Sequence, residues 1–113
     1  MELEALQATL QHLQERPRMH IFDERYTTFV AYIDGLESED GMCRDFSDWL
    51  ARRYLGCDSN KHWVGLINDR VYPDSEWTPT YLGDLDETAS APLVREMFER
   101  WSEFLTERRN PSV

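Results

Sequence analysis

The stretch QERPRMHIF, residues 14–22, decides how the chain begins to fold, because it interrupts a regular amphipathic pattern. Four leucines precede it at alternating steps of three and four, the spacing of one face of an α-helix: Leu3, Leu6, Leu10 and Leu13. Pro17 lacks an amide donor and disfavours helical backbone at the residue before it. The first helix is therefore predicted to end at Arg16.

After the proline, the same stretch carries three apolar side chains in close succession, Met19, Ile21 and Phe22. We expect all three to pack into the core and fix a corner between two helices, and we expect His20 to be partly exposed. The stretch is interpreted as a structural corner rather than as a catalytic motif.

Two further helices follow from the apolar periodicity. Asp23 can cap the first of them, in which apolar residues repeat at steps of four and three: Phe22, Tyr26, Phe29, Ile33 and Leu36. The next is predicted from about Met42 to Leu55, with Gly56 as its terminator. Its inward side chains are predicted to be Met42, Phe46, Trp49, Leu50 and Tyr54.

The second half of the chain has a less regular pattern. NKHWVGLIN, residues 60–68, fits a short helix capped by Ser59 or a strand, and about 69–87 has no lasting period. A last helix is predicted to start near residues 88–92, with a proline in its first turn. Its inward side chains are predicted to be Leu93 or Val94, Met97, Trp101, Phe104 and Leu105. On its surface, Arg95 is expected to pair with Glu99 and Glu96 with Arg100. We predict one mainly α domain, residues 1–113: a compact bundle of four to five helices with one long aromatic loop.

The net charge of −10 is concentrated in two segments. Residues 34–48 and residues 69–87 each carry a net charge of −5, and the rest of the chain is balanced. Such segments fit either a solvated surface that aids solubility or an electronegative face for a basic partner. Direct binding of nucleic acid is disfavoured, because contacts with phosphates need a basic stripe and none is present.

Composition also bears on the cellular compartment. No stretch approaches the roughly 20 apolar residues that cross a bilayer, and the acidic N-terminal segment lacks the pattern of a secretory signal. Cys43 and Cys57 flank a predicted helix, which places their Cα atoms about 20 Å apart, too far for a disulfide within one chain. We therefore expect a cytoplasmic protein with no membrane association.

A search for catalytic and cofactor motifs favours a protein that is not an enzyme. Cys57, His20 and His62 lack the sequence surroundings of a nucleophile with its base, and no spacing is typical of a metal or nucleotide site. We expect no catalytic residues, no metal and no cofactor. A glycosidase-type carboxylate pair stays open as an alternative, that of a small hydrolase.

RPRMHIF, residues 16–22, resembles the string Arg-Pro-Gly-Met-Tyr-Ile/Leu-Gly of small bacterial immunity proteins of polymorphic toxin systems. The order of segments is similar as well: LQHLQERPRMHIF, FVAYIDGL, FSDWLARRYLG, then a short helix with tryptophan. The resemblance covers residues 6–67 and the final helix, and Arg18 and Phe22 stand where the string has glycines. The string also occurs in the ATPase domain of type II topoisomerases, but 113 mostly helical residues leave no room for that fold.

The resemblance implies an inhibitor that neutralises a cognate toxin, and the charge favours a basic nuclease or another nucleic-acid-directed enzyme as the partner. The candidate partner-binding residues combine acids of both segments with loop aromatics: Asp34, Glu37, Asp45, Asp48, Tyr72, Asp74, Glu76, Trp77, Tyr81 and Asp84. Trp77 fits either an interface anchor or a lid over the core. A DNA mimic that blocks a DNA-binding protein is the main alternative, and a homodimer through apolar helical faces stays open.

Overall fold

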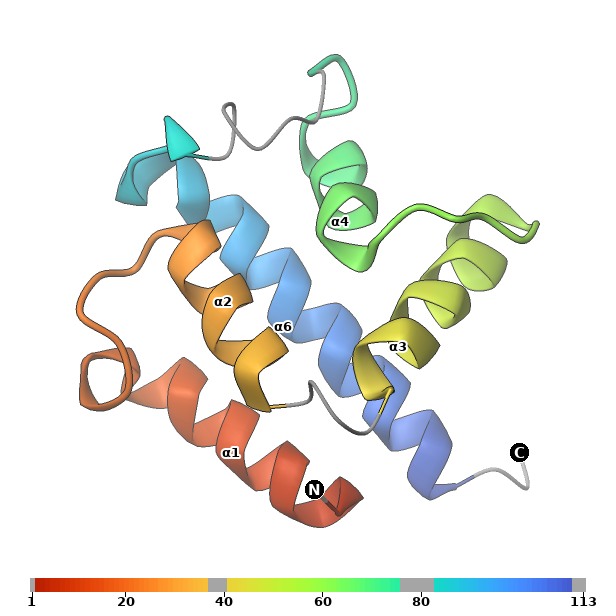
Figure 1. Ribbon diagram of the computed structural model, residues 1–113, viewed down its shortest axis with the longest axis horizontal. Coiled ribbons are helices and arrows are strands. Elements are labelled where there is room, and N and C mark those ends of the chain that lie inside the picture. The colour runs from red at the N-terminus through yellow and green to blue at the C-terminus, as the bar shows by residue number, and fades with distance from the viewer. Residues whose placement is uncertain (1, 37–40, 76–82, 111–113) are drawn as a thin grey trace.

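The computed structural model describes residues 2–36, 41–75 and 83–110. Within these ranges the chain forms five α-helices and no strand, as predicted (Figure 1). The helices are α1 (Leu3–Glu15), α2 (Tyr26–Leu36), α3 (Met42–Leu50), α4 (Trp63–Val71) and α6 (Glu87–Arg109). A 3-10 turn, η1 (Pro17–Met19), follows α1, and a π-helical turn, η2 (Ala51–Leu55), continues α3.

Helix α6 is the axis of the bundle, because α1, α2, α3 and α4 all contact it (Figure 1). Each shorter helix buries one apolar face: Leu6, Leu10 and Leu13 of α1 are buried, as are Phe29 and Ile33 of α2. The sequence predicts that Leu93, Met97 and Trp101 of α6 face inward, and this prediction is confirmed because all three side chains are fully buried. Since the apolar faces of α1, α2, α3 and α4 pack against α6, the five helices share one hydrophobic core.

Four buried aromatic side chains, which we call the aromatic centre, fill the core between α3, α4 and α6: Phe46, Trp63, Trp101 and Phe104. The rings of Phe46 and Trp101 stack with centroids 4.0 Å apart. Trp63 meets Trp101 edge to face at 5.8 Å, and Phe104 lies 5.4 Å from Phe46. Such contacts add to the free energy from buried area, so this centre is the strongest packing feature of the fold.

The helix ends follow the predictions in part. Helix α1 stops before Pro17 as expected. The imidazole of His62 caps α4 by accepting the amide of Val64 at 3.3 Å, whereas Ser59 accepts the amide of Lys61 instead. The carboxylate of Asp86 caps α6, which therefore starts earlier than predicted and places Pro92 in its second turn.

The third helix changes its pitch before it ends. Residues 51–55 adopt the wider π turn, and Gly56 then terminates the helix with a φ of +74°, a left-handed conformation that suits glycine. The predicted span of residues 42–55 is thus helical throughout, although its last turn is not α-helical. Trp49 and Tyr54, expected to face inward, are only half-buried.

Candidate partner-binding site

The structure describes six of the ten candidate partner-binding residues. Asp48, Asp74 and Asp84 are exposed, and Asp34 is half-buried at the end of α2. These four acids, called here the unpaired acids, form no ion pair with any described residue. Asp45 differs, because Arg108 Nη1 lies 3.4 Å from its carboxylate. The other four candidates lie outside the described residues: Glu37, Glu76, Trp77 and Tyr81.

Tyr72 contributes to the fold rather than projecting to solvent. Its side chain is half-buried against the core, and its hydroxyl donates to the carbonyl of Ala89 at 2.8 Å. This bond connects the end of α4 with the first turn of α6. A partner would reach only part of this side chain.

The basic side chains are largely committed to ion pairs within the chain. Counting only pairs with described residues, seven of the twelve lysine and arginine residues form them: Arg18, Arg53, Lys61, Arg70, Arg100, Arg108 and Arg109. Because these bases are paired within the chain, their charge is locally neutralised, whereas the unpaired acids have no ion-pair partner among the described residues.

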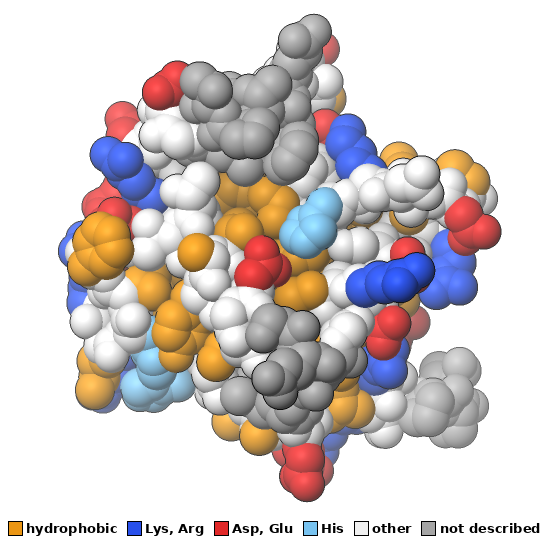
Figure 2. All heavy atoms as spheres, viewed as in Figure 1, with side chains coloured by type: hydrophobic (Ala, Val, Ile, Leu, Met, Phe, Trp, Pro, Cys, Tyr) orange, Lys and Arg blue, Asp and Glu red, His pale blue; other side chains and the backbone are white. Residues whose placement is uncertain are grey.

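The unpaired acids do not form one continuous patch. The segments that follow α4 and precede α6 lie at the top of the view, whereas the end of α2 lies lower and Asp48 lies in the second half of α3 (Figure 1). Figure 2 shows hydrophobic side chains gathered between α2 and α4 on this face, with acidic side chains separated from one another. The arrangement combines apolar surface with dispersed negative charge.

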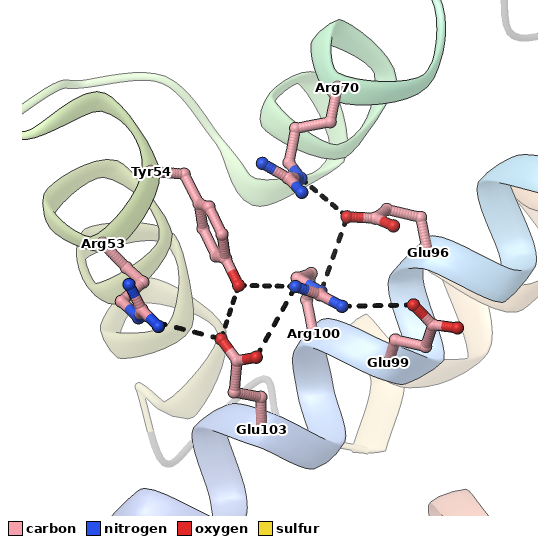
Figure 3. Close-up of polar contacts among 7 residues, drawn as sticks. All are labelled: Arg53, Tyr54, Arg70, Glu96, Glu99, Arg100 and Glu103. Atoms are coloured by element: carbon pink, nitrogen blue, oxygen red, sulfur yellow. Dashed lines mark hydrogen bonds and ion pairs between the residues drawn. The ribbon is translucent and has the colours of Figure 1, made fainter.

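A second set of charged residues, which the sequence did not predict, joins η2 to α4 and α6. We call it the Tyr54 cluster, and its members surround one phenol ring (Figure 3): Arg53, Tyr54, Arg70, Glu96, Glu99, Arg100 and Glu103. The hydroxyl of Tyr54 donates to Glu103 Oε1 at 2.6 Å and accepts a hydrogen bond from Arg100. Arg70 pairs with Glu96 at 2.6 Å, and its guanidinium carbon lies 4.1 Å from the centroid of the Tyr54 ring.

The electrostatics of the Tyr54 cluster follow from its partial burial. Burial raises the pKa of Tyr54, the bond to Glu103 adds to this, and Arg100 opposes it. For Arg100, burial would lower the pKa, but the bond to Tyr54 and the charges of Glu96 and Glu103 outweigh it and raise the pKa. With three arginines and three glutamates the cluster has no formal net charge. Its arrangement fits a structural connection better than a site for a charged ligand.

The predicted pair Glu96–Arg100 is present, with Arg100 Nε 3.4 Å from Glu96 Oε1. Glu99 pairs with Arg100 at 3.1 Å rather than with Arg95. Spacing along one helix could predict only these local contacts. The partners from η2 and α4 are distant in sequence, so no local pattern marks them.

The prediction that Met19 and Phe22 pack into the core is wrong. Phe22 is 82% exposed and Met19 is 67% exposed, and of the three apolar residues only Ile21 is buried, at 9%. The backbone of the corner accounts for this: η1 covers only Pro17–Met19, and the amides of His20 and Ile21 both donate to the carbonyl of Pro17. In this tight turn Ile21 is buried, whereas Met19 before it and Phe22 after it are left exposed. His20 is half-buried, as expected.

Arg18 holds the corner, which we define as residues 16–25, in this shape. Its guanidinium donates to the carbonyl of Phe22 and to Glu87 Oε2, the latter at 3.1 Å, and its Nε lies 3.5 Å from Glu24 Oε2. Asp23 accepts the Thr28 hydroxyl at 2.6 Å and the amide of Arg25 at 3.1 Å, and these two bonds keep the pKa of Asp23 below its ordinary value. The corner is thus fixed on both sides of Phe22.

Three side chains in and beside the corner form a chain of hydrogen bonds. His12 Nδ1 lies 2.6 Å from His20 Nε2, and His20 Nδ1 lies 2.9 Å from the hydroxyl of Tyr32. These hydrogen bonds tie the last turn of α1 to α2 across the corner. They border an open groove of about 640 Å³.

The structure adds little to the search for other chemistry. Within the described ranges, no three histidine, cysteine, aspartate or glutamate side chains are grouped as metal ligands. None of the described helices is long and apolar enough to span a membrane. Cys43 is half-buried and Cys57 is exposed, and both are free thiols. No known protein family, curated protein or solved structure matches the chain.

Proposed function

We propose that the protein is an immunity-type inhibitor that acts in the cytoplasm by binding and neutralising a cognate bacterial toxin. The partner is a basic protein, a nuclease or another nucleic-acid-directed enzyme, whose active site is covered by an acidic and apolar surface. A site built to bind phosphates attracts carboxylates, so charge accelerates the encounter of such a pair.

One observation carries the proposal: most bases form ion pairs with described residues of the chain, while the unpaired acids form none with a described residue. The fold therefore presents its net charge outward. The apolar side chains between α2 and α4 support a compact protein interface, which typically has an apolar centre and a polar margin (Figure 2). A DNA mimic would need an extended row of carboxylates, and the described acids are dispersed.

The test is co-expression with the toxin encoded beside this gene, followed by measurement of association rates with the purified pair. The variant neutralises the unpaired acids: Asp34→Asn, Asp48→Asn, Asp74→Asn and Asp84→Asn. Its on-rate should fall by about tenfold or more at low salt, with a smaller change in off-rate. The on-rate of the unmodified protein should also fall as salt shortens the screening length to about 8 Å.

A matched control changes the net charge equally at exposed acids outside the two acidic segments: Glu2→Gln, Glu15→Gln, Asp58→Asn and Glu107→Gln. It should slow association much less than the variant does. If the variant and the control slow association equally, the effect comes from the overall net charge, and the unpaired acids are not the binding surface. Failure to protect cells from the toxin or to bind it would refute the proposed function.

A further inference from the structure

Two of the three histidines face each other through their ring nitrogens. His12 Nδ1 lies 2.6 Å from His20 Nε2, and the two ring planes are nearly perpendicular, with centroids 4.8 Å apart. The other ring nitrogen of His20 lies 2.9 Å from the hydroxyl of Tyr32. We call these three side chains the histidine link, and the proposed inhibitor function does not use them.

The histidine link connects parts of the chain that the backbone joins only through the corner. His12 is in the last turn of α1, His20 is in the corner and Tyr32 is in α2. Arg18 holds the other side of the corner, through the carbonyl of Phe22 and through Glu87 of α6. The histidine link is therefore the contact that fixes the end of α1 against α2.

The number of protons on the two imidazoles decides whether this contact can exist. In the neutral pair, one ring N–H donates to the bare nitrogen of the other ring, and the Tyr32 hydroxyl donates to or accepts from His20 accordingly. One additional proton is tolerated, because a cationic imidazole still donates to a neutral one. A second additional proton places N–H groups on both facing nitrogens, so the hydrogen bond is lost and two adjacent cations repel each other.

The surroundings do not compensate two cations, because neither imidazole forms an ion pair with a carboxylate of any described residue. The charged residues that flank the histidine link come from α1, the corner and α6: Glu15, Arg16, Arg18, Asp23, Glu24, Arg25 and Glu87. Their acids have other partners. Glu24 and Glu87 pair with Arg18, Asp23 accepts from Thr28, and Glu15 accepts from Gln11. On α2, Asp34 is two residues beyond Tyr32 and therefore lies on the opposite side of the helix.

We propose that the histidine link is a pH-sensitive device that fastens α1 and the corner to α2 at neutral pH and opens at mildly acidic pH. The closed form holds at most one additional proton and the open form holds two, so a fall in pH favours the open form. Histidine is the side chain whose unperturbed charge changes between about pH 5 and 8. Carboxyl groups ordinarily gain protons near about pH 4, so the histidine link opens before the ion pairs of the corner are affected.

The test is hydrogen exchange of the full chain, followed by NMR at about pH 7.5 and about pH 5, with rates corrected for the pH dependence of exchange itself. The reporters are corner amides that donate to backbone carbonyls: Arg16, Met19, His20 and Ile21. Their protection should fall by about tenfold or more, because the open form binds one more proton and gains up to about tenfold per pH unit. The amides of Asp45 and Tyr72, bonded within α3 and α4, are the internal references and should change little.

His12→Gln and His20→Gln each leave one titrating imidazole in the link, so the protection of the reporter amides should differ by less than about twofold between the two pH values. His62→Asn is the matched control. It removes the third histidine, while asparagine can still cap α4, and it should keep the full fall in protection.

Equal protection of the reporter amides at both pH values in the unmodified protein overturns the proposal. A fall that persists in both glutamine variants, or that disappears in His62→Asn, overturns it as well, as does unfolding of the whole protein by circular dichroism at the lower pH. Ring-nitrogen NMR shifts of the unmodified protein give a second test that needs no variant. His12 and His20 should take up their protons in two separate steps, and uptake in one common step contradicts the link. Failure of the toxin-binding test leaves these results unaffected, because no partner is needed.

Discussion

The corner and the Tyr54 cluster each connect a helix end to α6 through an arginine with several acceptors, but they differ in exposure. The side chain of Arg18 at the corner is 55% exposed, whereas that of Arg100 in the Tyr54 cluster is 16% exposed. Apolar side chains are also arranged oppositely. Phe22 points away from the protein at the corner, while the ring of Tyr54 lies among arginines and packs against the core.

This difference indicates which contacts contribute most to stability. An exposed ion pair contributes up to about 1 kcal/mol, because water and salt screen it. In a half-buried set, removal of its least exposed cation leaves acceptors without a partner and costs more, about 2 kcal/mol. The corner should therefore be tolerant of substitution, whereas the region around Tyr54 should not.

The largest loss of unfolding free energy is expected for a substitution in the aromatic centre. Trp101→Ala removes a fully buried indole that stacks on Phe46, so it should lower the free energy of unfolding by about 3–5 kcal/mol. Urea titration followed by circular dichroism measures this loss. Trp49→Ala, at a half-buried position, is the comparison and should cost clearly less; equal losses would mean that the centre is not the main packing element.

The next largest effect is expected for Arg100→Met, which keeps the aliphatic stem but removes the guanidinium. The change leaves the Tyr54 hydroxyl without its donor and takes a shared cation from Glu96 and Glu103, and it should cost about 2 kcal/mol. Arg95→Met, at an exposed position of the same helix, should change stability by less than about 0.5 kcal/mol. If Arg100→Met and Arg95→Met lose similar amounts of unfolding free energy, the Tyr54 cluster contributes no more to stability than exposed surface charges do.

A smaller effect should follow from alkaline pH. Tyr26 donates to the carbonyl of Val64 at 3.0 Å, and burial, assisted by the charge of Asp34, raises its pKa well above the ordinary value. Above about pH 10 the unfolded chain loses the phenol proton while the folded chain retains it. Stability should therefore be constant below pH 10 with respect to this group and fall as pH rises further.

Tyr26→Phe tests this expectation. Loss of the hydrogen bond should cost about 1 kcal/mol at pH 7, and the decline above pH 10 should become shallower. Tyr54→Phe should flatten the decline less, because Tyr54 is only half-buried. Chemical denaturation at a series of pH values gives both results; an unchanged slope in Tyr26→Phe would show that other groups control alkaline unfolding.

The smallest effect is expected for Arg18→Met. Its ion pairs with Glu24 and Glu87 are exposed, so their loss should lower the free energy of unfolding by less than about 1 kcal/mol. Hydrogen exchange at residues 19–25 should nevertheless become faster, because Arg18 no longer holds the carbonyl of Phe22. A loss as large as that of Arg100→Met would erase the distinction between the two regions.

The helices could be predicted from the sequence because their apolar periodicity is regular. Leu6, Leu10 and Leu13 repeat on one face and are buried, and Pro17 ends α1 as expected. The acids of the candidate site were also identified from charge density alone, and four of them are unpaired among the described residues. Local composition and spacing carry both kinds of information.

The remaining features depend on contacts between distant residues. The sequence favours Ser59 as the cap of α4, but the helix begins at Trp63, whose amide donates to Ser47 of α3, and His62 is its cap. At the corner, a tight turn that begins with η1 buries Ile21 but leaves Met19 and Phe22 exposed, and hydrophobicity alone does not indicate this turn. Tyr54 and Glu103 are 49 residues apart, so their hydrogen bond has no local signature.

The distribution of tryptophan has an optical consequence. All four tryptophans follow residue 48, and Trp63 and Trp101 lie in the aromatic centre away from water. Their emission should be blue-shifted and should move to longer wavelength when α3, α4 and α6 separate. The first 36 residues contain none, so separation of α1 from α6 should be reported by Trp101, which lines one pocket together with residues of α1. Fluorescence therefore follows α6 and the helices that pack against it, and the corner has no tryptophan of its own.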